Sequence, residues 1–162
     1  VGSYALNSNT TRSNLVAIGD SALYNNGVGA TQESQAIGNT ATGSKSLFAN
    51  TTGALNTATG TDALRSNSTG NNNTANGYYA LRNNSDGIEN TAIGVKALFN
   101  NTAGGFNTAM GMNSLLSNTT GSSNTALGLN ALLANTEGRE NTALGRESGF
   151  NNIAGSGNVF IG

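Results

Sequence analysis

The stretch Asn90-Thr91-Ala92-Ile93-Gly94 recurs along the chain in the form Asn-Thr-Ala-x-Gly, and successive copies begin seventeen residues apart. The full unit reads Asn-Thr-Ala-x-Gly-x-x-Ala-Leu-x-x-Asn-x-x-Gly-x-x, and we number its residues as positions one to seventeen. A repeat this short and regular is typical of a solenoid in which each unit forms one coil. The sequence therefore predicts a mainly β fold, a parallel β-solenoid (β-roll) with 17-residue coils. The asparagines that mark position one are Asn56, Asn73, Asn90, Asn107, Asn124, Asn141 and Asn158.

The repeat runs through the whole chain, so we predict one repeat domain over residues 1–162. Position five is glycine from Gly2 to Gly162, and its step is seventeen residues everywhere except between Gly19 and Gly43, where it is twenty-four. The additional residues form an irregular insertion near 31–38, which we expect to protrude. Both ends of the chain fall inside a unit, which indicates a segment of a longer protein.

Two columns of the predicted stack have clear structural roles. Leucine at position nine should form the core row, and asparagine at position twelve should form a turn ladder, because asparagine and glycine favour turns and stacked amides can pair. The core row is Leu23, Leu47, Leu64, Leu81, Leu98, Leu115 and Leu132. The turn ladder is Asn50, Asn67, Asn84, Asn101, Asn118 and Asn135.

The two apolar segments of each unit differ in how far the pattern defines them. Thr-Ala-x at positions two to four predicts a short strand. The Ala-Leu segment is compatible with either a second strand or one helical turn, because periodicity does not separate them over so few residues.

Composition excludes several classes of function. Only 9% of the 162 residues are charged, the net charge is −1, and seven scattered Lys and Arg supply no basic stripe for nucleic acid. Cysteine and histidine are absent, and the acidic residues fall at variable positions, so we expect no enzyme, no metal and no cofactor. No apolar run is long enough for membrane insertion.

The thin core predicted for one chain favours self-association. One leucine and two alanines per coil bury little apolar surface for seventeen ordered residues. Positions four and ten also tend to change together, as in Ile93 with Phe99 and Asn76 with Arg82, which suggests one shared face between chains. The alternative is that both rows belong to an ordinary single-chain core.

Two parts of the repeat resemble known fibre families. Asn14-Leu15-Val16-Ala17-Ile18-Gly19 resembles the repeat of trimeric autotransporter adhesin heads. The unit from Asn124 to Gly138 more closely resembles the repeats upstream of endosialidase-type intramolecular chaperone domains in phage tail fibres and bacterial surface fibres. The resemblance implies a homotrimer and an extracellular location, at a cell surface or on a virion tail fibre.

We therefore expect a structural and adhesive fibre segment, shaft or head, that contributes to receptor binding on a target cell surface. A cell-surface glycan is the candidate ligand, because adjacent exposed aromatic rings can stack on sugars; the same residues could instead pack on a neighbouring coil or chain. The candidate receptor contacts are Tyr78, Tyr79, Gln32, Glu33, Ile88 and Phe106. The alternative function is a monomeric ice-binding or surface-templating solenoid, suggested by the threonine column at position two.

Overall fold

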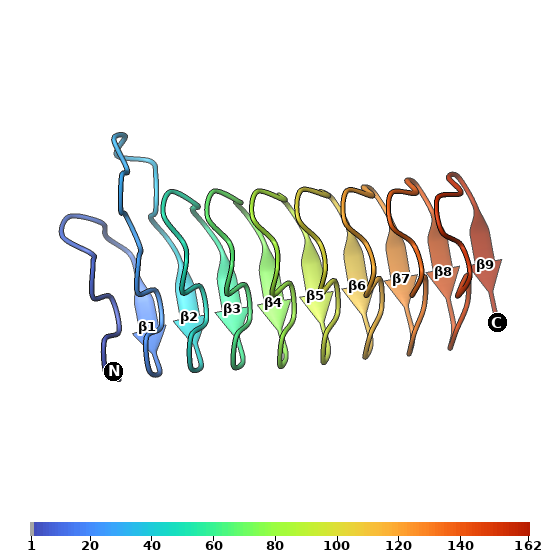
Figure 1. Ribbon diagram of the computed structural model, residues 1–162, viewed down its shortest axis with the longest axis horizontal. Coiled ribbons are helices and arrows are strands. Elements are labelled where there is room, and N and C mark those ends of the chain that lie inside the picture. Colours follow the sequence, from blue (N-terminus) through green and yellow to red (C-terminus); the bar gives the residue numbers. More distant parts are fainter. Residues whose placement is uncertain (1) are drawn as a thin grey trace.

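Most copies of Thr-Ala-x become short strands, and these strands stack in chain order into one parallel sheet (Figure 1). The structure, a computed structural model, describes residues 2–162. The predicted parallel β-solenoid with 17-residue coils is confirmed, with about 7 coils between Asn39 and Gly157. The strands are β1 Val16–Ile18, β2 Thr40–Thr42, β3 Thr57–Thr59, β4 Thr74–Asn76, β5 Thr91–Ile93, β6 Thr108–Met110, β7 Thr125–Leu127, β8 Thr142–Leu144 and β9 Val159–Ile161.

The register of the sheet places each residue beside the same position of the next coil. Thr74 pairs with Thr91, and Ala75 pairs with Ala92. Because side chains alternate along a strand, the alanine at position three points into the coil while positions two and four point outward. Ala75 and Ala92 are accordingly fully buried.

The segment between positions five and twelve forms consecutive reverse turns. The N–H groups of Ala97 and Asn101 donate to the carbonyls of Gly94 and Leu98, three residues earlier, over 3.3 and 3.2 Å. Lys96 and Leu98 have φ angles of 58° and 52°. An α-helix requires negative φ at each residue, so alternating signs of φ prevent it. The predicted helical turn is therefore wrong, and so is the alternative of a second strand. Residues 2–162 contain no helix, and this segment consists of turns.

These turns hold the leucine column inside the coil. The backbone N–H of each leucine donates to a carbonyl of the next coil, as Leu98 does to Ser114 at 3.0 Å. The whole core row is fully buried and packs against the alanines of positions three and eight. In the last full coil Gly149 replaces the leucine, and a Cβ there would lie 2.7 Å from the ring of Phe160. Phe160 occupies position three, where other coils have alanine, so its ring fills the space that Gly149 leaves in place of leucine.

Glycine at position five allows the coils to approach closely. Gly94 has a φ of 129°, which other residues rarely adopt, and a Cβ on it would lie 2.8 Å from the carbonyl carbon of Gly111. The turn motif suggests that position fifteen is glycine because it needs a positive φ, but the structure gives a different reason. Gly104 has no positive φ, but a Cβ there would lie 2.5 Å from the side-chain oxygen of Asn101.

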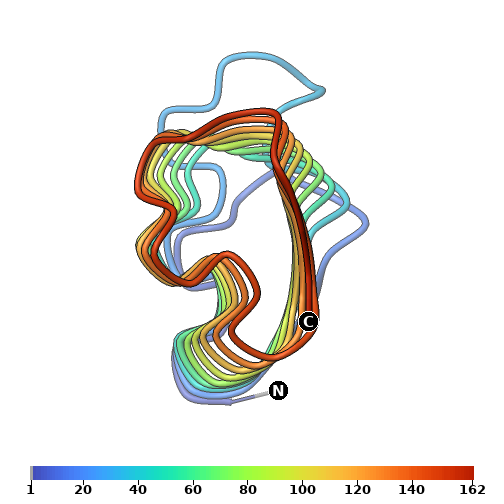
Figure 2. The same cartoon turned by 90° about the vertical axis from the view of Figure 1, so that its right-hand side faces the viewer.

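Each coil is flattened, with its strand along one long side and its turn segment along the other (Figure 2). Positions four and ten do not share a face within one chain, because position four lies on the strand side and position ten on the turn side. Their contact between chains stays a prediction. Ile93 at position four is 37% exposed, and Phe99 at position ten is half-buried. The insertion rises from the edge of the rod near its N-terminal end, as a loop before β2 (Figure 1).

Burial in the leucine column is testable with two residues of one coil. Leu98→Ala should destabilise the protein by about 2–5 kcal/mol, because it leaves a cavity in a core of few side chains. Lys96→Ala is the matched control, since Lys96 has a similar φ but is exposed. Urea unfolding followed by circular dichroism would measure both variants. Equal stability of the two would contradict the proposed packing.

Candidate functional site

Two columns of buried asparagines run along the rod, one at position one and one at position twelve. In one coil, the Asn101 amide donates to the side-chain oxygen of Asn84 at 2.7 Å and to the carbonyl of Gly104 at 2.9 Å. The Asn90 amide donates to the side-chain oxygen of Asn73 at 3.2 Å and to the same Gly104 carbonyl at 2.8 Å. The backbone N–H of Asn90 also donates to the Asn73 side chain, at 3.0 Å.

The two columns meet near the N-terminal end. The side-chain oxygen of Asn26 accepts from Asn50 at 2.8 Å and from Asn39 at 3.2 Å. A single acceptor serves both columns because Leu15 occupies position one of that coil. All the predicted turn-ladder asparagines are fully buried, and their amides bond within the protein. They hold the coils together and offer no polar groove to a ligand.

Tyr78 and Tyr79 differ in what they can contact. Their rings stack with centroids 3.8 Å apart. Tyr79 also packs toward Arg82 and Phe99, with the guanidinium 5.2 Å and the Phe99 ring 5.9 Å from its own ring. Tyr78 stays 45% exposed, and a hydrogen bond to Tyr79 raises the pKa of its phenol. Of the pair, Tyr78 is therefore the one that presents a free ring face.

Gln32 and Glu33 lie on the protruding insertion with exposed side chains. The loop is anchored to the first coil by Arg12, which donates to the carbonyl of Gln32 at 3.0 Å and to that of Ala30 at 2.7 Å. An open pocket of about 450 Å³ lies where the loop meets that coil. Its lining residues are Thr11, Arg12, Ser13, Glu33 and Ile37.

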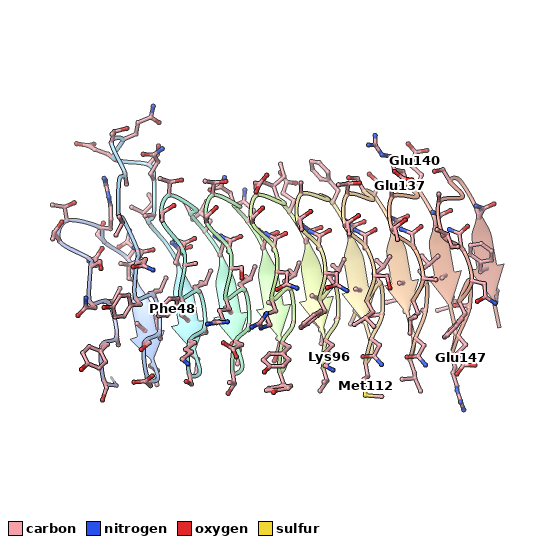
Figure 3. The ribbon with its side chains drawn as sticks, in the orientation of Figure 1. Phe48, Lys96, Met112, Glu137, Glu140 and Glu147 are labelled. Carbon is pink, nitrogen blue, oxygen red and sulfur yellow. The ribbon has the colours of Figure 1, made fainter. Side chains whose placement is uncertain are left out.

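Ile88 and Phe106 occupy neighbouring coils and meet at the coil edge. The backbone N–H of Phe106 donates to the carbonyl of Ile88 at 3.0 Å, and Phe106 is 53% exposed. This edge, at positions sixteen and seventeen, carries Glu140, whereas Lys96 at position seven lies at the opposite edge (Figure 3). The six candidate contacts therefore form three separate places on the rod: the tyrosine pair, the insertion, and the Ile88–Phe106 pair.

A further apolar feature lies at positions four and six of the C-terminal half, on either side of the position-five glycine. Among its members, Met110 and Met112 are 41% and 49% exposed. The corresponding positions of the preceding coils hold polar residues such as Thr59 and Thr61. Reading position six coil by coil would have found this feature in the sequence. We name it the apolar stripe: Ile93, Val95, Met110, Met112, Leu127, Leu129 and Leu144.

The threonine column lies on the outer surface of the sheet, one residue per strand. Adjacent members are separated by the spacing of neighbouring strands, about 4.8 Å. Their exposure ranges from half-buried, as for Thr91, to exposed, as for Thr74. The column consists of Thr40, Thr57, Thr74, Thr91, Thr108, Thr125 and Thr142.

Residues 2–162 contain neither a cluster of metal ligands nor a membrane-spanning helix. No three His, Cys, Asp or Glu side chains of that range gather closely enough to hold a metal ion. None of its segments forms a helix long and apolar enough to cross a membrane.

No protein-family model, curated protein or solved structure matches the chain. The resemblance to fibre repeats therefore stays a prediction, and the function has to be argued from the geometry.

The asparagine columns generate a second prediction, on two adjacent residues. Asn101→Ala should leave the side-chain oxygen of Asn84 and one amide N–H of Asn118 without partners, because both bond to Asn101. Each orphaned buried group costs about 1–3 kcal/mol. Asn100→Ala is the control, since Asn100 is half-buried and accepts only a 3.3 Å bond from Asn83. Thermal unfolding should show a clearly larger loss for Asn101→Ala, and comparable losses would refute the structural role of this column.

Proposed function

We propose that this chain is a structural segment of an adhesive fibre, in which three parallel copies form a rod that presents binding surfaces to a target cell. The apolar stripe carries this proposal. It places a row of exposed and half-buried aliphatic side chains along successive coils of a protein that otherwise has a thin core. Covering the stripe would add the apolar burial that the single coil lacks.

The partner that best fits the stripe is a second copy of the same chain. Coils of equal height stack at one constant spacing, so parallel copies can meet coil against coil along the whole stripe. Apolar coils then face apolar coils, and the polar coils around Thr59 and Thr61 face their own equivalents. A closed ring of such contacts gives a finite assembly. The number three comes from the resemblance to trimeric fibre repeats, as does the extracellular location.

The proposed role needs no catalytic chemistry. The rod holds ligand-binding side chains at defined heights, and the exposed ring of Tyr78 and the insertion carrying Gln32 and Glu33 are the candidate receptor contacts. The insertion precedes β2, several coils before the stripe begins, so association through the stripe leaves it available. Tyr78 is the position-six residue of the coil before Val95, so it borders the stripe.

Light scattering on the purified chain tests this association. The wild type should have about three times the single-chain mass of 16.2 kDa. The double variant Met110→Glu with Met112→Glu should have the mass of one chain and keep its β circular dichroism, because charge cannot be buried cheaply in the interface. Thr120→Glu, an exposed change away from the stripe, is the control and should leave the mass unchanged. A wild type that is folded and monomeric would overturn the proposal.

The threonine column favours a second candidate, a monomeric ice-binding or surface-templating solenoid. A row of hydroxyl and methyl groups on a regular sheet could order water at the strand spacing. The column is one residue wide along most of the rod, because position four holds Thr only at Thr42 and Thr59 in β2 and β3. This narrowness makes the fibre the better-supported function.

Thermal hysteresis separates the two candidates. An ice-binding solenoid should lower the freezing point below the melting point, and Thr74→Tyr should remove that gap while Thr120→Tyr should not. The fibre proposal predicts no hysteresis for the wild type at any concentration. Hysteresis that depends on the threonine column would support the ice-binding solenoid and contradict the fibre.

A further inference from the structure

The coiling of the chain gathers cations that are far apart in the sequence. Four of the seven Lys and Arg lie at positions seven and ten of four successive coils, where Asp62 is the one acidic residue. We name this turn-side region the cationic patch: Lys45, Arg65, Arg82 and Lys96. At the strand spacing, three coil steps make it roughly 14 Å long. A protein of net charge −1 thus concentrates positive charge on one short length of the rod.

Two guanidinium groups form the centre of the patch, and neighbouring acids neutralise them incompletely. Arg65 pairs with Asp62, with 3.2 Å between its Nε and the carboxylate oxygen. Arg82, one coil further on, donates from Nη1 to the neutral side chain of Asn83 at 3.0 Å, and its buried Nε has no hydrogen-bond partner. None of the carboxylates in residues 2–162 forms an ion pair with Arg82. An anion bound at the solvent-facing part of the half-buried Arg82 side chain would balance its charge, although the buried Nε lies beyond reach.

Aromatic rings hold both guanidinium groups in place. The Arg65 group lies 5.9 Å from the ring of Phe48, and the Arg82 group lies 5.2 Å from the ring of Tyr79 and 5.9 Å from the ring of Phe99. Figure 3 shows Phe48 and Lys96 on this part of the rod. Such contacts orient the planar group before a ligand arrives, which reduces the entropy lost on binding.

The neighbouring groups point to the class of the anion. Tyr78 adds an exposed ring face beside Tyr79, whereas the Asp62 side chain is 14% exposed and pairs with Arg65. A sugar ring can stack on the exposed face of Tyr78. A nucleic-acid phosphate backbone usually requires more cationic contacts than four. We propose that the cationic patch binds a polysaccharide that carries carboxylate groups, with Arg82 pairing with the carboxylate and Tyr78 stacking on the sugar ring.

This inference rests on the proposed adhesive function, because that function places the rod at a target cell surface. Binding itself needs only the turn side of one rod. The patch adjoins the apolar stripe, because Lys96 and Met112 lie at the same edge of the rod (Figure 3), so assembly and binding are distinguished by their readouts, light scattering for assembly and calorimetry for binding.

Titration calorimetry with polygalacturonate, a polymer of carboxylated sugars, tests the assignment. The wild type should bind it at low salt and bind neutral dextran negligibly. Arg82→Gln and Tyr78→Ala should each weaken binding by about tenfold or more, as expected for a lost charge-assisted hydrogen bond or aromatic contact. Arg139→Gln, which removes an exposed cation elsewhere on the rod, should change binding less than twofold. Each variant should keep the wild-type melting temperature within a few degrees.

The other outcomes overturn the assignment. A folded wild type that does not bind polygalacturonate would contradict it. An equal loss of affinity in Arg139→Gln and Arg82→Gln would also contradict it, because it would indicate unspecific charge attraction. Tighter binding of single-stranded DNA than of polygalacturonate would assign the patch to nucleic acid instead. Light scattering separates this from the fibre proposal: a monomer that still binds polygalacturonate through Arg82 contradicts the fibre alone, and a trimer that does not bind contradicts the patch alone.

Discussion

The rod depends on keeping equal positions of successive coils directly above one another. Backbone pairing in the sheet fixes this register weakly, because a slip of two residues returns each strand side chain to its original face. The asparagine columns are more selective. The side-chain oxygen of Asn73 accepts two hydrogen bonds from Asn90, and any slip would leave buried amide groups unpaired on both columns. With this register kept, the leucines that the turns direct inward stack on one another in the core.

Close stacking also explains the unusual backbone of the turn side. Lys96 and Leu98 adopt positive φ, a conformation that costs about 1–2 kcal/mol per residue without glycine. This cost is offset because the turns direct every leucine inward. They also orient backbone N–H groups to donate hydrogen bonds to carbonyls of the next coil, as Leu98 does to Ser114. The conformation is therefore stabilised by the neighbours on either side, and an isolated coil would lack the bonds that maintain it.

The period alone was sufficient to predict the solenoid, the coil length and the identity of the stacked rows. It was not sufficient for the turn side, since nothing in Lys-Ala-Leu signals alternating φ; that preference arises from bonds between coils. The expectation that positions four and ten share a face fails within one chain for the same reason, because the path of the turns decides where position ten points. The grouping of Arg65 with Arg82 could have been read from the register, whereas their aromatic neighbours and the unpaired Nε of Arg82 required coordinates.

Stacking constrains some positions of the repeat and leaves others free, and the free positions hold the features that we connect with function. Positions one, three, five, nine, twelve and fifteen are held nearly constant by amide pairing, burial or close approach. Positions four, six, seven and ten vary from coil to coil, and they carry the apolar stripe in the C-terminal coils and the cationic patch in the N-terminal ones. Tyr78 marks the boundary, because it belongs to the same position-six row as Val95 and stacks on Tyr79, whose ring contacts Arg82 of the patch. Changing these rows coil by coil alters the surface while the bonds that fix the register stay intact, so one scaffold can separate self-association from ligand binding along its length.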